Sequence, residues 1–349
     1  MYNFLEVMLN FSPIESYGSG QNTLESGQNT SSCFARPYDE KLHMGLKDVA
    51  HLAALRTALQ VESGDVEAWP EQIELQLRLA GTLDEEPLVV SHLISESIVR
   101  MAVNATQRSL NRATPSAEAC KRLQSAFAHA GETNLLPSAL VGERAMMIPE
   151  FGLNLSQMQT LGENGPPGTH PRPRREYSGR SGYFVWLTGF FERDLDFYLE
   201  TMEGVMSFAA LPPPQSLALT NYMETAGNTG SKTFHPFSGM LLPSLSTIII
   251  REAAFRAQVE LATTALAVEH FRHDRQRLPE NLEELMPQFV EVVPTDPFDG
   301  AALRYRRLES GYVIYSIDAD GHDDGGREPP ELKKSTDKSS YDMTFMVER

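Results

Sequence analysis

The sequence predicts an α+β protein that is mainly α, with a helical bundle, one long helix and a small antiparallel β-sheet. Apolar residues recur at helical spacing in successive runs between residues 46 and 208. The longest run covers residues 243–273, and the spacing changes to that of strands over residues 303–316. With 349 residues, 41% of them hydrophobic, the chain can bury a substantial core.

Composition excludes several classes of protein. The formal net charge is -17 and the pI is near 5.0, which argues against a broad nucleic-acid-binding face because phosphate contacts need clustered basic residues. The two cysteines, Cys33 and Cys120, lack metal-ligand spacing, so neither a disulfide framework nor a zinc site is expected. No apolar run reaches about 18 residues, so no membrane span is expected. The N-terminus has no basic region of the kind that begins a signal peptide.

Composition shifts divide the chain into five segments. Residues 1–36 are polar, contain the pentapeptide SGQNT twice, and are expected to be a disordered tail. Residues 37–161 are expected to form a helical domain, and residues 162–182 a linker rich in Pro, Gly and Arg. Residues 183–238 continue the helical part, and residues 239–349 contain the long helix and the β module.

In the helical domain, the first helix is expected around an apolar pattern between residues 46 and 61. That pattern consists of Leu46, Val49, Leu52, Ala53, Leu55, Leu59 and Val61. A second helix begins near Trp69, and a third follows Pro87. The third is apolar on more than one face, so we expect it at the centre of the bundle. Thr114 or Ser116 is expected to cap a helix over residues 117–129, and residues 135–147 form another.

Beyond the linker, an aromatic-rich helix should span residues 183–208 and stop at Pro212. The long helix follows from Pro243 to His273. Its apolar stripe is Leu241, Leu245, Ile248, Phe255, Val259, Ala262 and Leu266. Glu252 fills the one gap in this stripe. His270 and His273 lie three residues apart near its end, a spacing seen in metal pairs, but cations are also favoured at a helix C-terminus.

The last segment begins with a short helix over residues 278–285, followed by turn residues at 293–300. Residues 303–306 and 312–316 read as a hairpin turning at Ser310-Gly311, and residues 342–347 as a closing strand. Asp296 and Asp299, beside Pro297 and Gly300, are explained by the turn without catalysis.

This order of motifs resembles the major pseudopilins of type II secretion systems, which carry YP-x-SL-x-x-L, P-x-DPWG-x-P-x-x-Y and Y-x-x-x-S-x-G-x-DG after a long helix. The matching segments are LPENLEEL (278–285), PTDPFDG with Tyr305 (294–305), and Tyr312 followed by SIDADG (316–321). The resemblance covers about residues 240–349. Less closely, the whole chain resembles uncharacterised bacterial envelope proteins that carry the same module. The resemblance implies a pseudopilin-type sheet, protein partners in an envelope assembly, and a cell-envelope or periplasmic location.

In the pseudopilins the acidic loop after the last hairpin binds one calcium ion. The resemblance therefore implies a metal site at Asp318, Asp320, Asp323 and Asp324. Clustered carboxylates and nearby glycines suit calcium, which takes six to eight oxygen ligands. An EF-hand is an alternative for the same residues, with Asp320 first and Glu331 twelfth, but Pro329 and Pro330 stand where its helix should begin. A solvated acidic loop without a cation is the third interpretation.

No Walker loop, GxGxxG, HExxH or GxSxG motif occurs in the chain, so no enzyme is predicted from motifs. The sequence favours a non-enzymatic structural or interaction protein of a bacterial envelope or type II secretion-like system, with a calcium-stabilised C-terminal loop. The alternative is a hydrolase whose Asp, Glu and His residues meet between the helical domain and the β module. The oligomeric state is left open.

Overall fold

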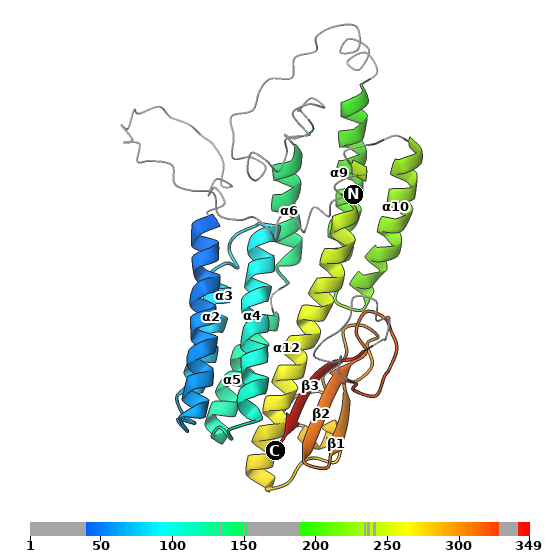
Figure 1. Cartoon of the computed structure of the whole chain (residues 1–349). Helices are drawn as coiled ribbons and strands as arrows, with labels where there is room; N and C mark the ends of the chain where they lie inside the picture. Colours follow the sequence, from blue (N-terminus) through cyan, green and yellow to red (C-terminus); the bar gives the residue numbers. More distant parts are fainter. Residues whose placement is uncertain are drawn as a thin grey trace, which may run out of the picture.

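The computed structural model describes residues 40–132, 134–148, 151, 189–233, 235, 238–239, 242–327 and 341–349. The predicted tail, the predicted linker and Glu331 lie outside these residues. Helices run side by side through the described part, and a three-stranded antiparallel sheet packs beside the C-terminal half of the longest helix (Figure 1). This confirms the predicted mainly α, α+β fold.

The helices of the N-terminal half match the predicted runs. They are α2 (Glu40–Glu62), α3 (Trp69–Gly81), α4 (Val89–Leu110), α5 (Ala117–Glu132) and α6 (Leu136–Met147). The amide of Ala119 donates to Oγ of Ser116 at 3.3 Å, so Ser116 is the N-cap of α5. α4 is buried on several faces and contacts α2, α3, α6, α12 and the sheet, which confirms its predicted central position.

The second half is built on α9 (Phe190–Ala209), the short 3-10 helix η2 (Gln215–Ala218), α10 (Leu219–Thr233) and α12 (Pro243–Arg275). At 1.5 Å per residue, α12 is about 50 Å long. It extends along most of the bundle, from α9 and α10 at one end to the sheet at the other (Figure 1). Among the described residues, no helix is both long and apolar enough to cross a membrane.

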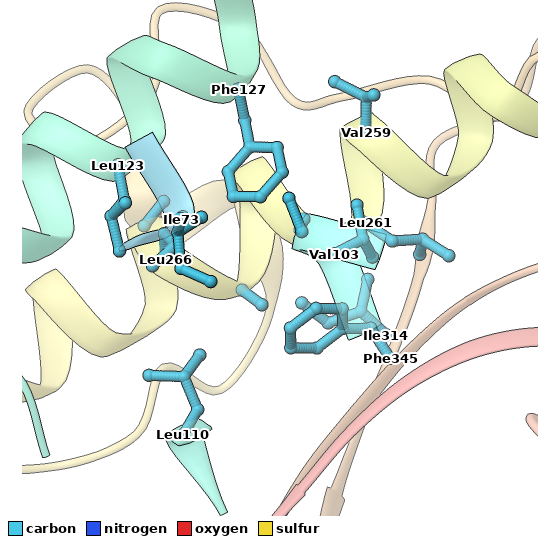
Figure 2. Close-up of a cluster of buried hydrophobic side chains, with 14 of the residues drawn as sticks. Ile73, Val103, Leu110, Leu123, Phe127, Val259, Leu261, Leu266, Ile314 and Phe345 are labelled. Carbon is cyan, nitrogen blue, oxygen red and sulfur yellow. The ribbon is translucent and has the colours of Figure 1, made fainter. Parts of the chain in front are cut away.

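Two groups of buried side chains form the core, and α12 contributes to both. One group joins α6, α9, α10 and the first turns of α12 and includes Tyr198, Met202 and Ile249. The other joins α2 to α5, the rest of α12 and the sheet. This second group includes Phe127, Val259 and Leu266 from helices and Ile314 and Phe345 from strands (Figure 2). Helices α2 to α5, most of α12 and the sheet therefore share one continuous core.

The sheet has the order β1 (Arg304–Leu308), β2 (Gly311–Ser316) and β3 (Met343–Glu348), each antiparallel to its neighbour. It follows the short 3-10 helix η3 (Leu282–Leu285). All six residues of β2 are buried, as expected for a central strand. On the edge of β3, Asn111 donates to the carbonyl of Met346 at 2.9 Å and accepts from the amide of Glu348 at 2.7 Å. The end of α4 therefore satisfies backbone groups that an open edge would expose.

Two glycines mark places where backbones come too close for a side chain. Gly311 has φ +128, and a Cβ there would lie 1.8 Å from the carbonyl oxygen of Val347. A Cβ on Gly142 would lie 1.5 Å from the carbonyl oxygen of Pro87, so α6 can approach the start of α4 only with glycine at this position.

The apolar pattern predicts that α2 is a helix, but its large residues do not mark the face that is buried. The fully buried residues of α2 are His43, Ala50, Ala53 and Thr57, and Leu46 and Val61 are partly buried against the same core. Leu52, Leu55 and Leu59 are 64%, 63% and 71% exposed. Ala50, Ala53 and Thr57 are small and let α2 pack closely against α3 and α4, which leaves Leu52, Leu55 and Leu59 on another face.

Candidate functional site

The turn before β1 is organised around the carboxylate of Asp296, which is fully buried. Its Oδ1 accepts from the amide of Phe298 at 3.0 Å and from Oγ of Ser316 at 2.8 Å. Its Oδ2 accepts from the amide of Ile317 at 3.0 Å and from the guanidinium of Arg304 at 2.5 Å. Arg304 also pairs with Asp299. Both aspartates therefore act within the turn, and Asp296 fixes the end of β2 where the acidic loop begins.

The four predicted metal ligands follow β2 along this loop. Asp318 has φ +58 and is half-buried, whereas Asp320 and Asp323 are exposed. Oδ1 of Asp318 accepts from the amide of Ala319 at 2.7 Å, and Oδ1 of Asp320 accepts from that of His322 at 2.9 Å. Asp323 makes the same kind of bond with Gly325. These carboxylates fold the loop through its own amides.

Asp342, which precedes β3, joins this loop and was not predicted as a ligand. Its carboxylate accepts from the amides of Asp324 at 3.3 Å and Gly326 at 2.7 Å. Burial raises the pKa of Asp342, and the charges of Asp323 and Asp324 raise it further. Asp342 stands at the start of the predicted closing strand. Because β3 pairs with β2, which leads into the loop, this position places Asp342 beside the loop.

The carboxylate oxygens of this loop are the type of ligand that calcium prefers, but they do not point toward one common position. Burial and the charges of Asp320, Asp296 and Asp342 raise the pKa of Asp318, as expected where carboxylates crowd together. All donors are oxygens, which calcium prefers. Within the described residues, however, no three carboxylates of the loop bring ligand atoms within 4.8 Å of one another. Carbonyl oxygens or water would have to supply much of a calcium shell here.

A second cluster of titratable residues is buried between α4 and α12. His92 and Glu96 lie one turn apart on α4, and Glu252 faces them from α12. Nε2 of His92 is 3.0 Å from Oε2 of Glu252 and 3.3 Å from Oε1 of Glu96. Nε of Arg256 donates to Oε1 of Glu252 at 2.6 Å. In the described residues this is the one set of three such side chains with ligand atoms within 4.8 Å.

Electrostatics favour a protonated His92 in this cluster. Burial alone would lower the pKa of His92, but hydrogen bonds to Glu252 and Glu96 and their charges outweigh burial and raise it to about 10. For Glu252, burial acts in the opposite direction and would raise the pKa, but His92 and Arg256 outweigh burial and lower it. Two cations then balance two carboxylates, so the cluster is neutral without a metal ion. We interpret it as an ionic link between the two central helices.

The cluster was not predicted from the sequence, although one signal for it is present there. Glu252 occupies the gap in the apolar stripe of α12, where a charged side chain must be buried with a partner. No pattern in the sequence identifies His92 as that partner, because 160 residues separate the two.

Next to the cluster, a depression of about 140 Å³ opens between the helices and the turn before β1. It is lined by Gly131, Pro213, Arg256, Val259, Glu260, Thr295 and Pro297. Burial raises the pKa of Glu260, and Arg256 opposes this shift. Glu260 is the one carboxylate of this lining, and the β module contributes only Thr295 and Pro297. The depression thus brings together no pair of carboxylates from the helices and the sheet.

Two further histidine arrangements have structural explanations. Ser91 Oγ and Glu86 Oε2 both contact the same nitrogen of His43, at 2.9 and 2.8 Å, and Ser91 donates to Glu86 at 2.6 Å. A Ser-His-acid triad instead needs the acid on the other ring nitrogen. His270 packs edge-on against Phe289, with ring centroids 4.9 Å apart, and His273 is exposed.

The chain was compared with protein-family models, curated proteins and solved structures, and none of the three comparisons gives a match.

Proposed function

We propose that this chain is a non-enzymatic structural or interaction protein of a bacterial envelope assembly related to type II secretion, with a calcium-stabilised loop at Asp318–Asp324. The observation that carries the non-enzymatic part is the continuous core between the helices and the sheet. An enzyme acting between these parts needs a cleft with convergent catalytic groups, whereas a scaffold needs a solid connection. The envelope assignment rests on the resemblance of residues 240–349 to pseudopilins.

The calcium assignment is supported by the chemistry of the loop. Asp318 and Asp342 have raised pKa values, partly because neighbouring carboxylates repel a further negative charge. A bound divalent cation would remove this repulsion and stabilise the folded loop by mass action. Asp320, Asp323 and Asp324 provide further oxygen donors, and Asp342 organises the backbone of the loop.

Thermal unfolding tests the proposal. We expect the wild-type chain to melt several degrees higher in millimolar calcium than in chelator, because a ligand that binds only the folded state stabilises it. The Asp320→Ala, Asp324→Ala double variant should lose this difference.

The matched control is an Asp48→Ala, Asp65→Ala double variant, which removes two carboxylates outside the loop and should keep the calcium response. Equal melting temperatures of the wild-type chain in calcium and in chelator would rule out calcium stabilisation.

The alternative function is a hydrolase with a site between the helices and the sheet. The depression beside Arg256 and Glu260 favours it, because a polar opening lies at that boundary. If the chain hydrolyses a substrate there, Glu260→Gln should abolish the activity and leave the melting temperature nearly unchanged. An activity that survives Glu260→Gln would place the reaction elsewhere.

A further inference from the structure

A row of exposed apolar side chains runs along α2. Eleven large hydrophobic residues in the described part are at least one-third exposed, and six of them lie on this helix. α2 is the outermost helix on the side of the bundle away from the sheet (Figure 1). We define the α2 stripe as Leu42, Gly45, Val49, Leu52, Arg56 and Leu59. Exposed patches of this kind on a folded protein mark interaction surfaces.

The spacing within the α2 stripe is that of a coiled coil. Successive members are three, four, three, four and three residues apart, which is the heptad a/d pattern. The a positions are Leu42, Val49 and Arg56, and the d positions are Gly45, Leu52 and Leu59. This surface therefore fits another helix lying nearly parallel or antiparallel to α2.

We propose that the α2 stripe pairs with the α2 stripe of a second copy of this chain, in antiparallel orientation. A two-fold axis between residues 50 and 51 makes the stripe complementary to itself, as an isologous interface requires. Val49 then faces Leu52 of the other copy, Leu42 faces Leu59, and Arg56 faces Gly45. No atom from the rest of the described chain lies within 4 Å of a Cβ built on Gly45, so this position has space for the long arginine stem of the second copy.

The flanking positions favour the same orientation. On one flank of the stripe, Ala53 is only 4% exposed and Leu46 packs against the core of its own chain, so a partner cannot contact that side. The other flank carries Lys41, Asp48, Leu55 and Glu62 and is exposed. A parallel pair brings opposite flanks together, whereas an antiparallel pair can place the two exposed flanks side by side.

Charge also distinguishes the two orientations. In a parallel pair, Arg56 would face Arg56 of the second copy across the interface, which is unfavourable. In the antiparallel pair, Lys41 lies near Glu62 of the second copy, which also pairs with Arg112 of its own chain. Lys41 and Arg56 balance Asp48 and Glu62 within the surface, so its local charge does not oppose pairing, although the whole chain has a net charge of -17.

Sedimentation of the full chain over a concentration range tests the proposal. We expect a dimer that forms at micromolar concentrations, and we expect Leu52→Glu to weaken it at least about 100-fold because the substituted residues lie beside the two-fold axis. The matched control is Val292→Glu, which charges a side chain that is 71% exposed elsewhere and should leave the dimer intact. Arg56→Leu should strengthen the dimer, since it replaces the polar a position of the stripe.

Cross-linking tests the orientation, in a chain that carries Cys33→Ser and retains the buried Cys120. A mixture of the Val49→Cys and Leu52→Cys variants should form mixed disulfides faster than Leu52→Cys alone. Faster cross-linking of Leu52→Cys with itself would overturn the antiparallel arrangement.

Three results of the sedimentation experiment would overturn the proposal. The first is a wild-type chain that stays monomeric at several hundred micromolar, and the second is a dimer that Leu52→Glu leaves intact. The third is a chain that dimerises only after removal of residues 1–36, which would assign the stripe to the chain's own N-terminal segment. Circular dichroism of Leu52→Glu should show an unchanged melting temperature for the monomer, because Leu52 is 64% exposed.

Discussion

Asp296 shows how one buried side chain positions a whole loop. Its two carboxylate oxygens accept four hydrogen bonds, from two backbone amides, a hydroxyl and a guanidinium. These donors come from the turn before β1, from β1 itself and from the end of β2. Four hydrogen bonds offset the free-energy cost of burying this carboxylate. If the carboxylate loses its charge, several of its donors are left poorly paired.

We predict that Asp296→Asn destabilises the chain by about 2–4 kcal/mol, because the amide removes the charge that Arg304 needs and turns an NH2 group toward other donors. Asp299→Asn is the matched control. Asp299 pairs with the same arginine but is partly exposed, so its replacement should cost less than about 1 kcal/mol. Urea unfolding of the two variants measures the difference, and equal losses would contradict the role given to Asp296.

At the residue scale, the sequence predicted chemistry only where the signal was local. The Asp-Pro and Asp-Gly pairs at residues 296–300 define a turn by themselves, and Ser116 signals a helix cap. Asp342 and His92 have no such local pattern, because their partners are brought to them by strand pairing and helix packing. The gap in the apolar stripe indicates that Glu252 is buried. It does not indicate that His92 is the residue that binds its carboxylate.

Between elements, an ionic cluster links α4 to α12 within a contact that is otherwise apolar. It consists of His92, Glu96, Glu252 and Arg256. Breaking a buried ion pair by removing one partner is costly because the remaining charge stays buried. One feature reduces the net stabilisation: Nδ1 of His92 is buried without a hydrogen-bond partner in the described residues. A protonated ring places an unsatisfied N–H there, which costs about 1–3 kcal/mol.

This link should make stability depend on pH. The folded-state pKa of His92 is about 10, above the usual value of 6.5. A group whose pKa is raised by folding stabilises the folded state fully below its unfolded pKa, and the effect is lost as pH rises through the folded pKa. The stabilisation from His92 should therefore decrease between pH 6.5 and about 10.

We predict that His92→Gln costs about 1–4 kcal/mol at pH 6.5 and that this cost shrinks as the pH approaches 10. Denaturant unfolding of the variant and the wild-type chain at each pH isolates the contribution of His92 from other titrating groups. His273→Gln is the matched control, since His273 is exposed and outside the cluster. A cost that stays constant over this range would show that His92 is neutral in the folded chain.

The elements themselves were predictable because each is periodic over many residues. The run of 33 residues in α12, the three strands and the helices of the N-terminal half all follow from spacing and turn residues. The buried face of α2 was not predictable in this way. Most of its leucines are exposed, and Ala50 and Ala53 face the core, because the packing distance between helices decides which face fits.

For the whole molecule, α12 is the element on which the arrangement depends. It contributes buried residues to both parts of the core, and buried Glu269 connects it to the sheet by accepting a hydrogen bond from Tyr312 at 3.1 Å. The β module is therefore attached to the helices by a shared core as well as by a buried hydrogen bond. In the proposed function, the acidic loop and the outer helix α2 are the surfaces through which the chain meets other molecules.

A measurement of calcium binding shows whether the acidic loop holds this ion. Isothermal titration of the full chain with calcium should give saturable binding of one ion. The Asp320→Ala, Asp324→Ala double variant should give no saturable heat. Magnesium should bind much more weakly, because it requires a strict octahedral geometry that the spread carboxylates of the loop do not provide. A wild-type chain that gives no saturable calcium binding, or a double variant that binds as tightly as wild type, would contradict the calcium-stabilised loop.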